Sequence, residues 1–143
     1  MIALISIALV GVTTLIHYEV LRGLTWTLPS LGIPPRMKVL VVIIAEFLAH
    51  GMEIVVYGLV ILLLAHWVQN GSLAGPGGTS LANCMYFSAE TYTSLGFGDL
   101  VPVGSIRLLA GVEALNGLLL IGWSASYAYI AMERFWRIGG NSS

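Results

Sequence analysis

The run Thr93–Asp99, Thr-Ser-Leu-Gly-Phe-Gly-Asp, has the residue types and spacing best suited to holding a bare cation. Gly96 and Gly98 stand at alternate positions, and glycine adopts a positive φ without steric penalty. A strand with such an alternating backbone can turn successive carbonyl oxygens to one side. Four such strands around one axis would form rings of oxygens able to replace the water shell of an ion. The run therefore predicts ion coordination by backbone atoms.

This run closely resembles the selectivity filter of the potassium-channel pore family, usually Thr-Val-Gly-Tyr-Gly-Asp. Two glycines and Asp99 match outright, whereas Ser94 stands for Thr, Leu95 for Val and Phe97 for Tyr. The resemblance implies K⁺ ions held along a filter made of Ser94, Leu95, Gly96, Phe97 and Gly98. Phe97 lacks the phenol hydroxyl that usually ties this filter to the surrounding helices, so one restraint on filter stability is absent.

Two carboxylates and a hydroxyl stand beside the filter run as expected supports: Glu90, Thr93 and Asp99. In some bacterial channels that the run resembles, a carboxylate at the position of Glu90 shares a proton with the Asp after the filter. Two close carboxylates raise one pKa strongly. We therefore hypothesise that Glu90 and Asp99 share a proton that acts as a latch behind the filter.

The composition indicates an integral membrane protein that interacts with the lipid bilayer. Of the 143 residues, 57% are hydrophobic and 9% charged, whereas soluble domains average about 25% charged residues. This length predicts a single membrane domain, residues 1–143. The net charge of -1 gives no indication of nucleic-acid binding.

Three apolar blocks are long enough for helices that cross a bilayer, which takes about 20 residues. They are an extra N-terminal helix (2–21), an outer helix (39–67) and an inner helix (106–135). Between the last two lies a flexible, turn-rich stretch (69–78), followed by a short helix over 80–93 that Thr79 or Ser80 could cap. That helix is too short to span, so it predicts a re-entrant pore helix leading into the filter at 94–98. The expected fold is an all-α membrane protein with three transmembrane helices.

The basic residues orient this topology. Five of the six lie at one side, namely Arg22, Arg36, Lys38, Arg134 and Arg137, and Arg107 lies at the other. By the positive-inside rule the N-terminus is outside and the C-terminus is cytoplasmic. The first block has no basic stretch before it, which favours a retained membrane helix over a cleaved signal peptide. The expected location is a bacterial inner membrane.

Two glycines in the third block have two possible roles. Gly117 and Gly122 lie midway along it, and small residues allow helices to pack closely in membranes. The family resemblance suggests instead that they serve as a gating hinge of the inner helix. Both alternatives stay open.

Ionisable residues within the apolar blocks form a second candidate site: His17, Glu46, His50 and Glu53. Three of them follow i, i+4, i+7 spacing and share one helix face. Such groups are costly inside a membrane and are usually paired or functional. They could form a hydrogen-bonded seam between the first two helices, a proton sensor, or a divalent-metal site. By depth we expect His17 to lie nearer Glu46 than Glu53, and Glu113 to face the outer helix or the back of the pore helix.

These observations predict a potassium channel that conducts passively as a homotetramer, because one filter run per chain requires four chains to close the oxygen rings. A non-selective or divalent-regulated cation channel is the alternative. An intramembrane metal-binding protein or enzyme built on the histidines and glutamates is a remote one, and we expect no enzymatic activity.

Overall fold

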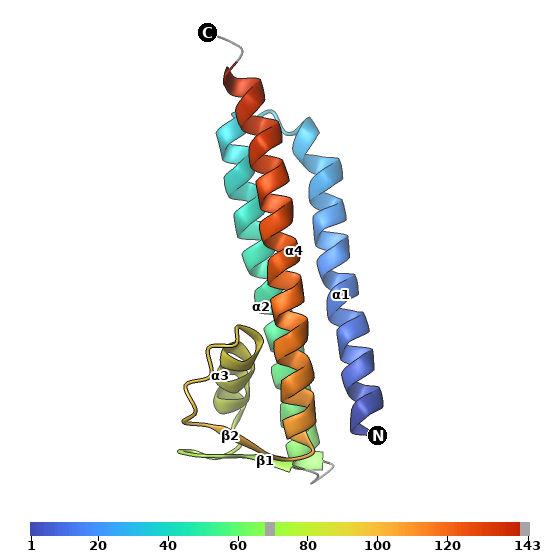
Figure 1. Ribbon diagram of the computed structural model, residues 1–143, viewed down its shortest axis with the longest axis vertical. Coiled ribbons are helices and arrows are strands. Elements are labelled where there is room, and N and C mark those ends of the chain that lie inside the picture. The colour runs from blue at the N-terminus through green and yellow to red at the C-terminus, as the bar shows by residue number, and fades with distance from the viewer. Residues whose placement is uncertain (68–70, 141–143) are drawn as a thin grey trace.

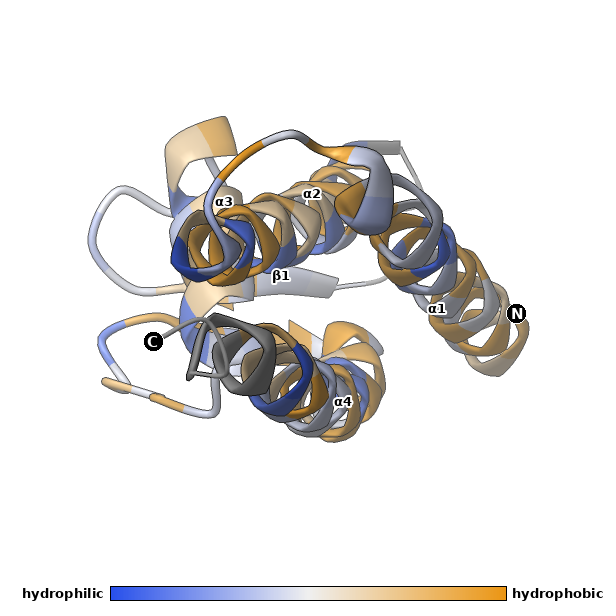
Figure 2. Cartoon of the chain, turned by 90° about the horizontal axis from the view of Figure 1, so that it is seen from above, coloured by the Kyte–Doolittle hydropathy of each residue, from blue (hydrophilic) through white to orange (hydrophobic). Residues whose placement is uncertain are grey.

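The computed structural model describes residues 1–67 and 71–140. Three long helices run side by side: α1 (Ile2–Thr27), α2 (Pro35–Trp67) and α4 (Ile106–Gly140) (Figure 1). Each contains a stretch long and apolar enough to cross a membrane. Viewed from above, hydrophobic residues predominate along all three (Figure 2). The expected all-α membrane fold with three spanning helices is confirmed.

The first helix continues past Leu21, where the apolar block was expected to end, to Thr27. The Thr25 hydroxyl donates to the Leu21 carbonyl at 2.8 Å, and the Thr27 hydroxyl donates to the carbonyl four residues before it. Such bonds let hydroxyl residues remain in a helix, which hydropathy alone does not reveal. A 3₁₀ turn, η1 (Leu28–Ser30), follows and contains Pro29.

A short helix, α3 (Leu81–Tyr92), packs against α2 and α4 near one end of the molecule (Figure 1). The Ser80 side chain caps it by accepting a hydrogen bond from the Asn83 backbone N–H at 3.2 Å. Thr79, the other capping candidate, instead accepts from the backbone N–H of Leu73 at 2.9 Å. The cap therefore falls on Ser80, and Thr79 ties the start of α3 to the preceding loop.

Two strands frame α3 and the segment after it: β1 (Gly71–Ala74) and β2 (Val101–Gly104). They pair antiparallel, with Gly71 opposite Gly104. This pairing corrects the expectation of a flexible stretch over 69–78, of which residues 69 and 70 lie outside the described residues. The backbone packs closely here, because a Cβ on Gly75 would lie 2.3 Å from the Asp99 carbonyl oxygen.

Apolar side chains form two separate buried clusters. One lies around α3 and the sheet and includes Tyr57, Ile61, Cys84, Phe87, Tyr92, Leu100, Ile106 and Leu109. The other lies between the opposite ends of the long helices and includes Leu21, Leu24, Leu28, Val39, Val42, Ala131 and Phe135. The N-terminus lies at the end that carries α3 and the sheet, and the C-terminus lies at the other end (Figure 1).

Candidate functional site

The filter segment, residues 93–99, follows the carboxyl end of α3. Its backbone alternates between residues with positive φ and residues with negative φ. Ser94, Gly96 and Gly98 have φ of 57°, 55° and 81°. The two glycines adopt this conformation freely, whereas Ser94 adopts it against the usual preference of L-residues. The Glu90 carbonyl accepts from the N–H groups of Leu95 at 2.8 Å and Gly96 at 3.2 Å. The last turn of α3 thus fixes the start of the segment.

Glu90 lies buried behind the filter segment. Its Oε2 atom accepts a hydrogen bond from the backbone N–H of Phe97 at 3.2 Å. Phe97 carries no hydroxyl, so this bond restrains its backbone where its side chain cannot. Thr93, the other expected support on this side, donates its hydroxyl to the Ala89 carbonyl at 2.7 Å. Both residues therefore connect the segment to α3.

Asp99, at the far end of the segment, accepts a hydrogen bond from the Tyr86 hydroxyl at 3.1 Å. Tyr86 was not predicted from the sequence, although it lies one helical turn before Glu90 on the same face of α3. Desolvation, the bond to Asp99 and the charges of Asp99 and Glu90 raise the Tyr86 pKa above its ordinary value. The phenol therefore remains a donor at neutral pH. Proton sharing between Glu90 and Asp99 remains a prediction.

Two large apolar side chains of the segment project away from the chain. Leu95 is 60% exposed and Phe97 is 68% exposed. Neither side chain packs against the rest of its own chain. Their surfaces are available to a neighbouring surface, which is a condition for a filter shared between subunits.

Gly117 and Gly122, the two candidate hinge glycines of α4, have different surroundings. A Cβ on Gly117 would lie 2.1 Å from the carbonyl oxygen of Tyr92, whereas a Cβ on Gly122 would meet no atom within 4 Å. Gly117 therefore allows α4 to pass the carboxyl end of α3, the close-packing role that the sequence left open. A hinge at Gly117 or Gly122 remains a prediction, and α4 is a continuous helix at both.

The second candidate site is a group that we call the buried seam: His17, His50, Glu53, Tyr92 and Ser124. His17 Nδ1 lies 3.0 Å from Glu53 Oε1, and His50 Nδ1 lies 3.2 Å from Glu53 Oε2. The Tyr92 hydroxyl also donates to Glu53, and it lies 2.9 Å from His50 Nδ1. The seam joins all four helices between the two apolar clusters. Tyr92 and Ser124 were missed, because no spacing within one helix points to them.

The expectation that His17 lies nearer Glu46 is wrong, since His17 contacts Glu53 directly. Helical side chains tilt toward the N-terminus of their own helix. In the antiparallel α1 and α2, His17 and Glu53 therefore lean toward each other along the membrane normal. The expectation used only the rise of the backbone along each helix, and it did not include the length and tilt of the two side chains. Glu46 is buried, and its Oε1 has no hydrogen-bond partner within residues 1–67 and 71–140.

Two further polar contacts hold the helices together. Glu113 is fully buried and accepts from the Ser88 hydroxyl at 2.5 Å, so it faces α3, the expected pore helix and one of the two expected alternatives. The Asn116 side-chain amide donates to the Thr13 hydroxyl at 2.8 Å and to Tyr57 at 3.2 Å. These contacts position α4 against α3 and against α1.

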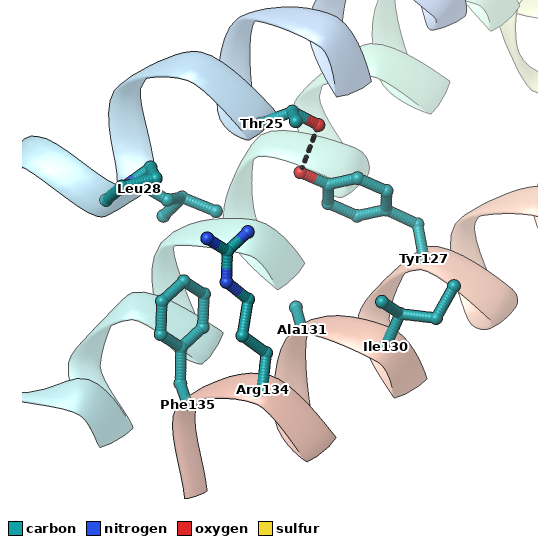
Figure 3. A pocket seen from close by; sticks show the side chains of 8 residues that line it. Thr25, Leu28, Tyr127, Ile130, Ala131, Arg134 and Phe135 are labelled. Carbon is teal, nitrogen blue, oxygen red and sulfur yellow. Dashed lines mark hydrogen bonds between the residues drawn. The ribbon is translucent and has the colours of Figure 1, made fainter. Parts of the chain in front are cut away.

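A pocket of about 210 Å³ lies at the opposite end from the filter segment, between the ends of α1 and α4 (Figure 3). The Thr25 and Tyr127 hydroxyls meet across it at 3.0 Å. The Arg134 side chain lies beside the Phe135 ring, with the guanidinium carbon 5.7 Å from the ring centroid. The pocket contacts neither the filter segment nor the seam.

The chain is similar to known ion channels. The family model described as ion channel matches residues 49–134. The inward rectifier potassium channel Kirbac3.1 of Paramagnetospirillum magnetotacticum is 36% identical over 62 residues, which are 43% of this chain and 20% of that protein. Two-pore potassium channel 1 of Arabidopsis thaliana is 27% identical over 95 residues, which are 66% of this chain and 23% of that protein. No solved structure matches.

The chain therefore spans about a fifth of the length of the curated relatives that it matches. The family match contains α3, the filter segment and nearly all of α4, and it begins within α2, whereas α1 lies outside it. Ion channels are membrane proteins and not enzymes. Because the match covers more than half of the chain, this protein belongs to the ion channel family.

Proposed function

We propose that this protein is a passive potassium-selective channel, in which four identical chains surround one conduction axis. The observation that carries the proposal is the alternating backbone of the filter segment, with positive φ at Ser94, Gly96 and Gly98. This alternation lets successive carbonyl oxygens face one side, as rings of oxygens that replace the hydration shell of K⁺ require. The similarity to two potassium channels supports the choice of ion.

Conduction would proceed by passage of dehydrated K⁺ in single file past the carbonyls of residues 94–97. Repulsion between neighbouring ions keeps each one from staying bound. Tetramerisation is supported by the exposed side chains of Leu95 and Phe97, which need a neighbouring surface. The gathering of Arg36, Lys38 and Arg134 at one end supports a cytoplasmic C-terminus in a plasma membrane.

The decisive experiment is a reversal-potential measurement on purified protein in liposomes or planar bilayers, with K⁺ on one side and Na⁺ on the other. A potassium pore gives a reversal potential displaced strongly toward the K⁺ equilibrium value. A reversal near zero would contradict selectivity while leaving a cation channel. A molecular mass in detergent that does not correspond to four chains would contradict the assembly.

The proton-sharing hypothesis has its own test within this proposal. Glu90→Gln keeps the shape of the side chain behind the filter but removes its titration. We expect the variant to lose the pH response of current decay that the wild type shows. An unchanged decay and pH response would remove the hypothesis without affecting the conduction proposal.

A non-selective or divalent-regulated cation channel is the second candidate. The buried seam favours it, because three side chains able to bind a divalent ion converge next to the end of the pore helix. Adding and chelating divalent ions during the same recordings distinguishes regulation from simple potassium conduction.

A further inference from the structure

The two histidines of the buried seam direct the same ring atom at one carboxylate. Nδ1 of His17, from α1, and Nδ1 of His50, from α2, lie 3.0 Å and 3.2 Å from the two oxygens of Glu53. A ligand atom from each of the three residues lies within 4.8 Å of the other two. A metal ion bound at about 2.0–2.2 Å from nitrogen and oxygen ligands could contact all three after small side-chain adjustments.

The opposite edges of the two rings share one partner, Ser124. Its hydroxyl oxygen lies 2.9 Å from His50 Nε2 and 3.2 Å from His17 Nε2. A hydroxyl has one proton, so it can donate to only one ring, but it can accept from both. When both rings are neutral and the hydroxyl accepts from both, each Nδ1 presents a lone pair toward the Glu53 carboxylate. A metal ion between the two rings and the carboxylate makes that arrangement favourable.

This arrangement resembles the surroundings of metal-bound histidines in general. A histidine ligand almost always donates its other ring N–H to an outer partner, which fixes the tautomer and the ring orientation. Ser124 can do this for both rings at once. Trp123, next to it on α4, packs against the His17 ring with centroids 5.4 Å apart. Both rings are thus held in place before any ion binds.

The acidic side chains near the seam suit a divalent cation. Glu46 lies on the same face of α2 as His50 and Glu53 and is 6% exposed. Its Oε1 has no hydrogen-bond partner in the described part of the chain. All six basic residues of the sequence lie within the first or last two turns of a long helix. A doubly charged cation at the seam would balance the charges of two buried carboxylates without a basic side chain nearby.

We propose that His17, His50 and Glu53 bind one divalent transition-metal ion per chain, of the class to which Zn²⁺ belongs, with the Tyr92 hydroxyl as a fourth donor. Imidazole and carboxylate together suit such ions. The ligands come from α1, α2 and the last residue of α3, so the ion would fasten α1 to the residue immediately before the filter segment. The site does not rest on the proposed conduction of K⁺.

The test uses the full chain in detergent, stripped with a chelator and then titrated with Zn²⁺ or Co²⁺. We expect one metal per chain by elemental analysis, a higher Tm, and the intense visible absorption of four-coordinate Co²⁺. His17→Gln and His50→Gln each remove a ligand and should weaken metal binding by more than about 100-fold. Ser124→Ala removes an outer partner of the ligands, so it should weaken binding by only about 10- to 100-fold. His66→Gln is the matched control, because His66 lies outside the seam and contacts the Leu62 carbonyl.

Two results would overturn the proposal. One is equal metal content in the wild type and in the His17 and His50 variants. The other is a wild-type Co²⁺ spectrum typical of the six-coordinate aqua ion, with no change in Tm on adding metal. This second measurement uses only the wild-type protein, so it does not depend on a variant that folds. Either result assigns the seam to protons and hydrogen bonds alone. K⁺ flux in the same preparations reports on the conduction proposal separately.

Discussion

The filter segment and the buried seam meet at adjacent residues, Thr93 and Tyr92, yet they hold their polar atoms differently. The filter segment presents backbone groups, and its Leu95 and Phe97 side chains remain largely exposed. The seam uses side chains from four helices, and every one of its members has a partner within the same chain. One chain thus completes the seam by itself, whereas the filter segment leaves two large apolar side chains exposed. Changes in the two regions should therefore affect different properties.

The largest expected effect is on conduction, from Gly96→Ala in the filter segment. Gly96 has φ of 55°, where an alanine costs about 1–2 kcal/mol in every chain. In a tetramer this strain acts four times, so we expect K⁺ flux to fall by more than about 100-fold. Flux into liposomes measures it.

Gly51→Ala is the matched control, because its Cβ would meet nothing within 4 Å on α2. If Gly96→Ala conducted as well as Gly51→Ala, the segment would not be the ion path.

The next effect is on folding, from Glu53→Ala in the seam. The change removes the carboxylate that His17, His50 and Tyr92 all contact, and breaking a buried pair typically costs about 3–5 kcal/mol. Thermal unfolding in detergent should show a clearly lower Tm. Glu19→Ala should change Tm little, since its pair with Arg22 is half exposed and such pairs contribute about 0–1 kcal/mol. Equal losses in the two variants would contradict the distinction.

A third prediction compares two glycines of α4, at the boundary between the regions. Gly117→Ala places a Cβ against the Tyr92 carbonyl, and overpacking of this kind costs about 1–3 kcal/mol. Gly122→Ala meets open space, so it should be neutral or gain up to about 1 kcal/mol of helix propensity. Tm values in detergent test both. A hinge at Gly122 would instead appear as an altered open probability with an unchanged Tm.

The smallest expected effect concerns the carboxyl end of the filter segment. Tyr86→Phe removes one exposed hydrogen bond to Asp99 and leaves the aromatic ring in place. We expect faster decay of K⁺ current with little change in selectivity. Tyr127→Phe is a matched control, since it loses a similar bond to Thr25 at the opposite end of the molecule. Identical decay in both variants would remove the role assigned to Tyr86.

Several features of the fold could be predicted from the sequence, because they depend on nearby residues. Runs of apolar residues predict spanning helices, and the absence of lysine and arginine from their middles strengthens that prediction. The helix ends were harder, since Thr25 and Thr27 extend α1 through local bonds that hydropathy does not register. The pairing of β1 with β2 was missed, because it joins segments on either side of α3.

The sequence alone determined that residues 93–99 can alternate in backbone hand and that ionisable residues share one face of α2, since both follow from spacing along the chain. Only the tertiary structure decided that His17 meets Glu53 rather than Glu46, and that Tyr92 and Ser124 complete the seam. Those contacts depend on how far side chains lean along antiparallel helices and on which helix faces meet. The spacing of residues within a single helix determines neither the lean of a side chain toward another helix nor which helix faces meet.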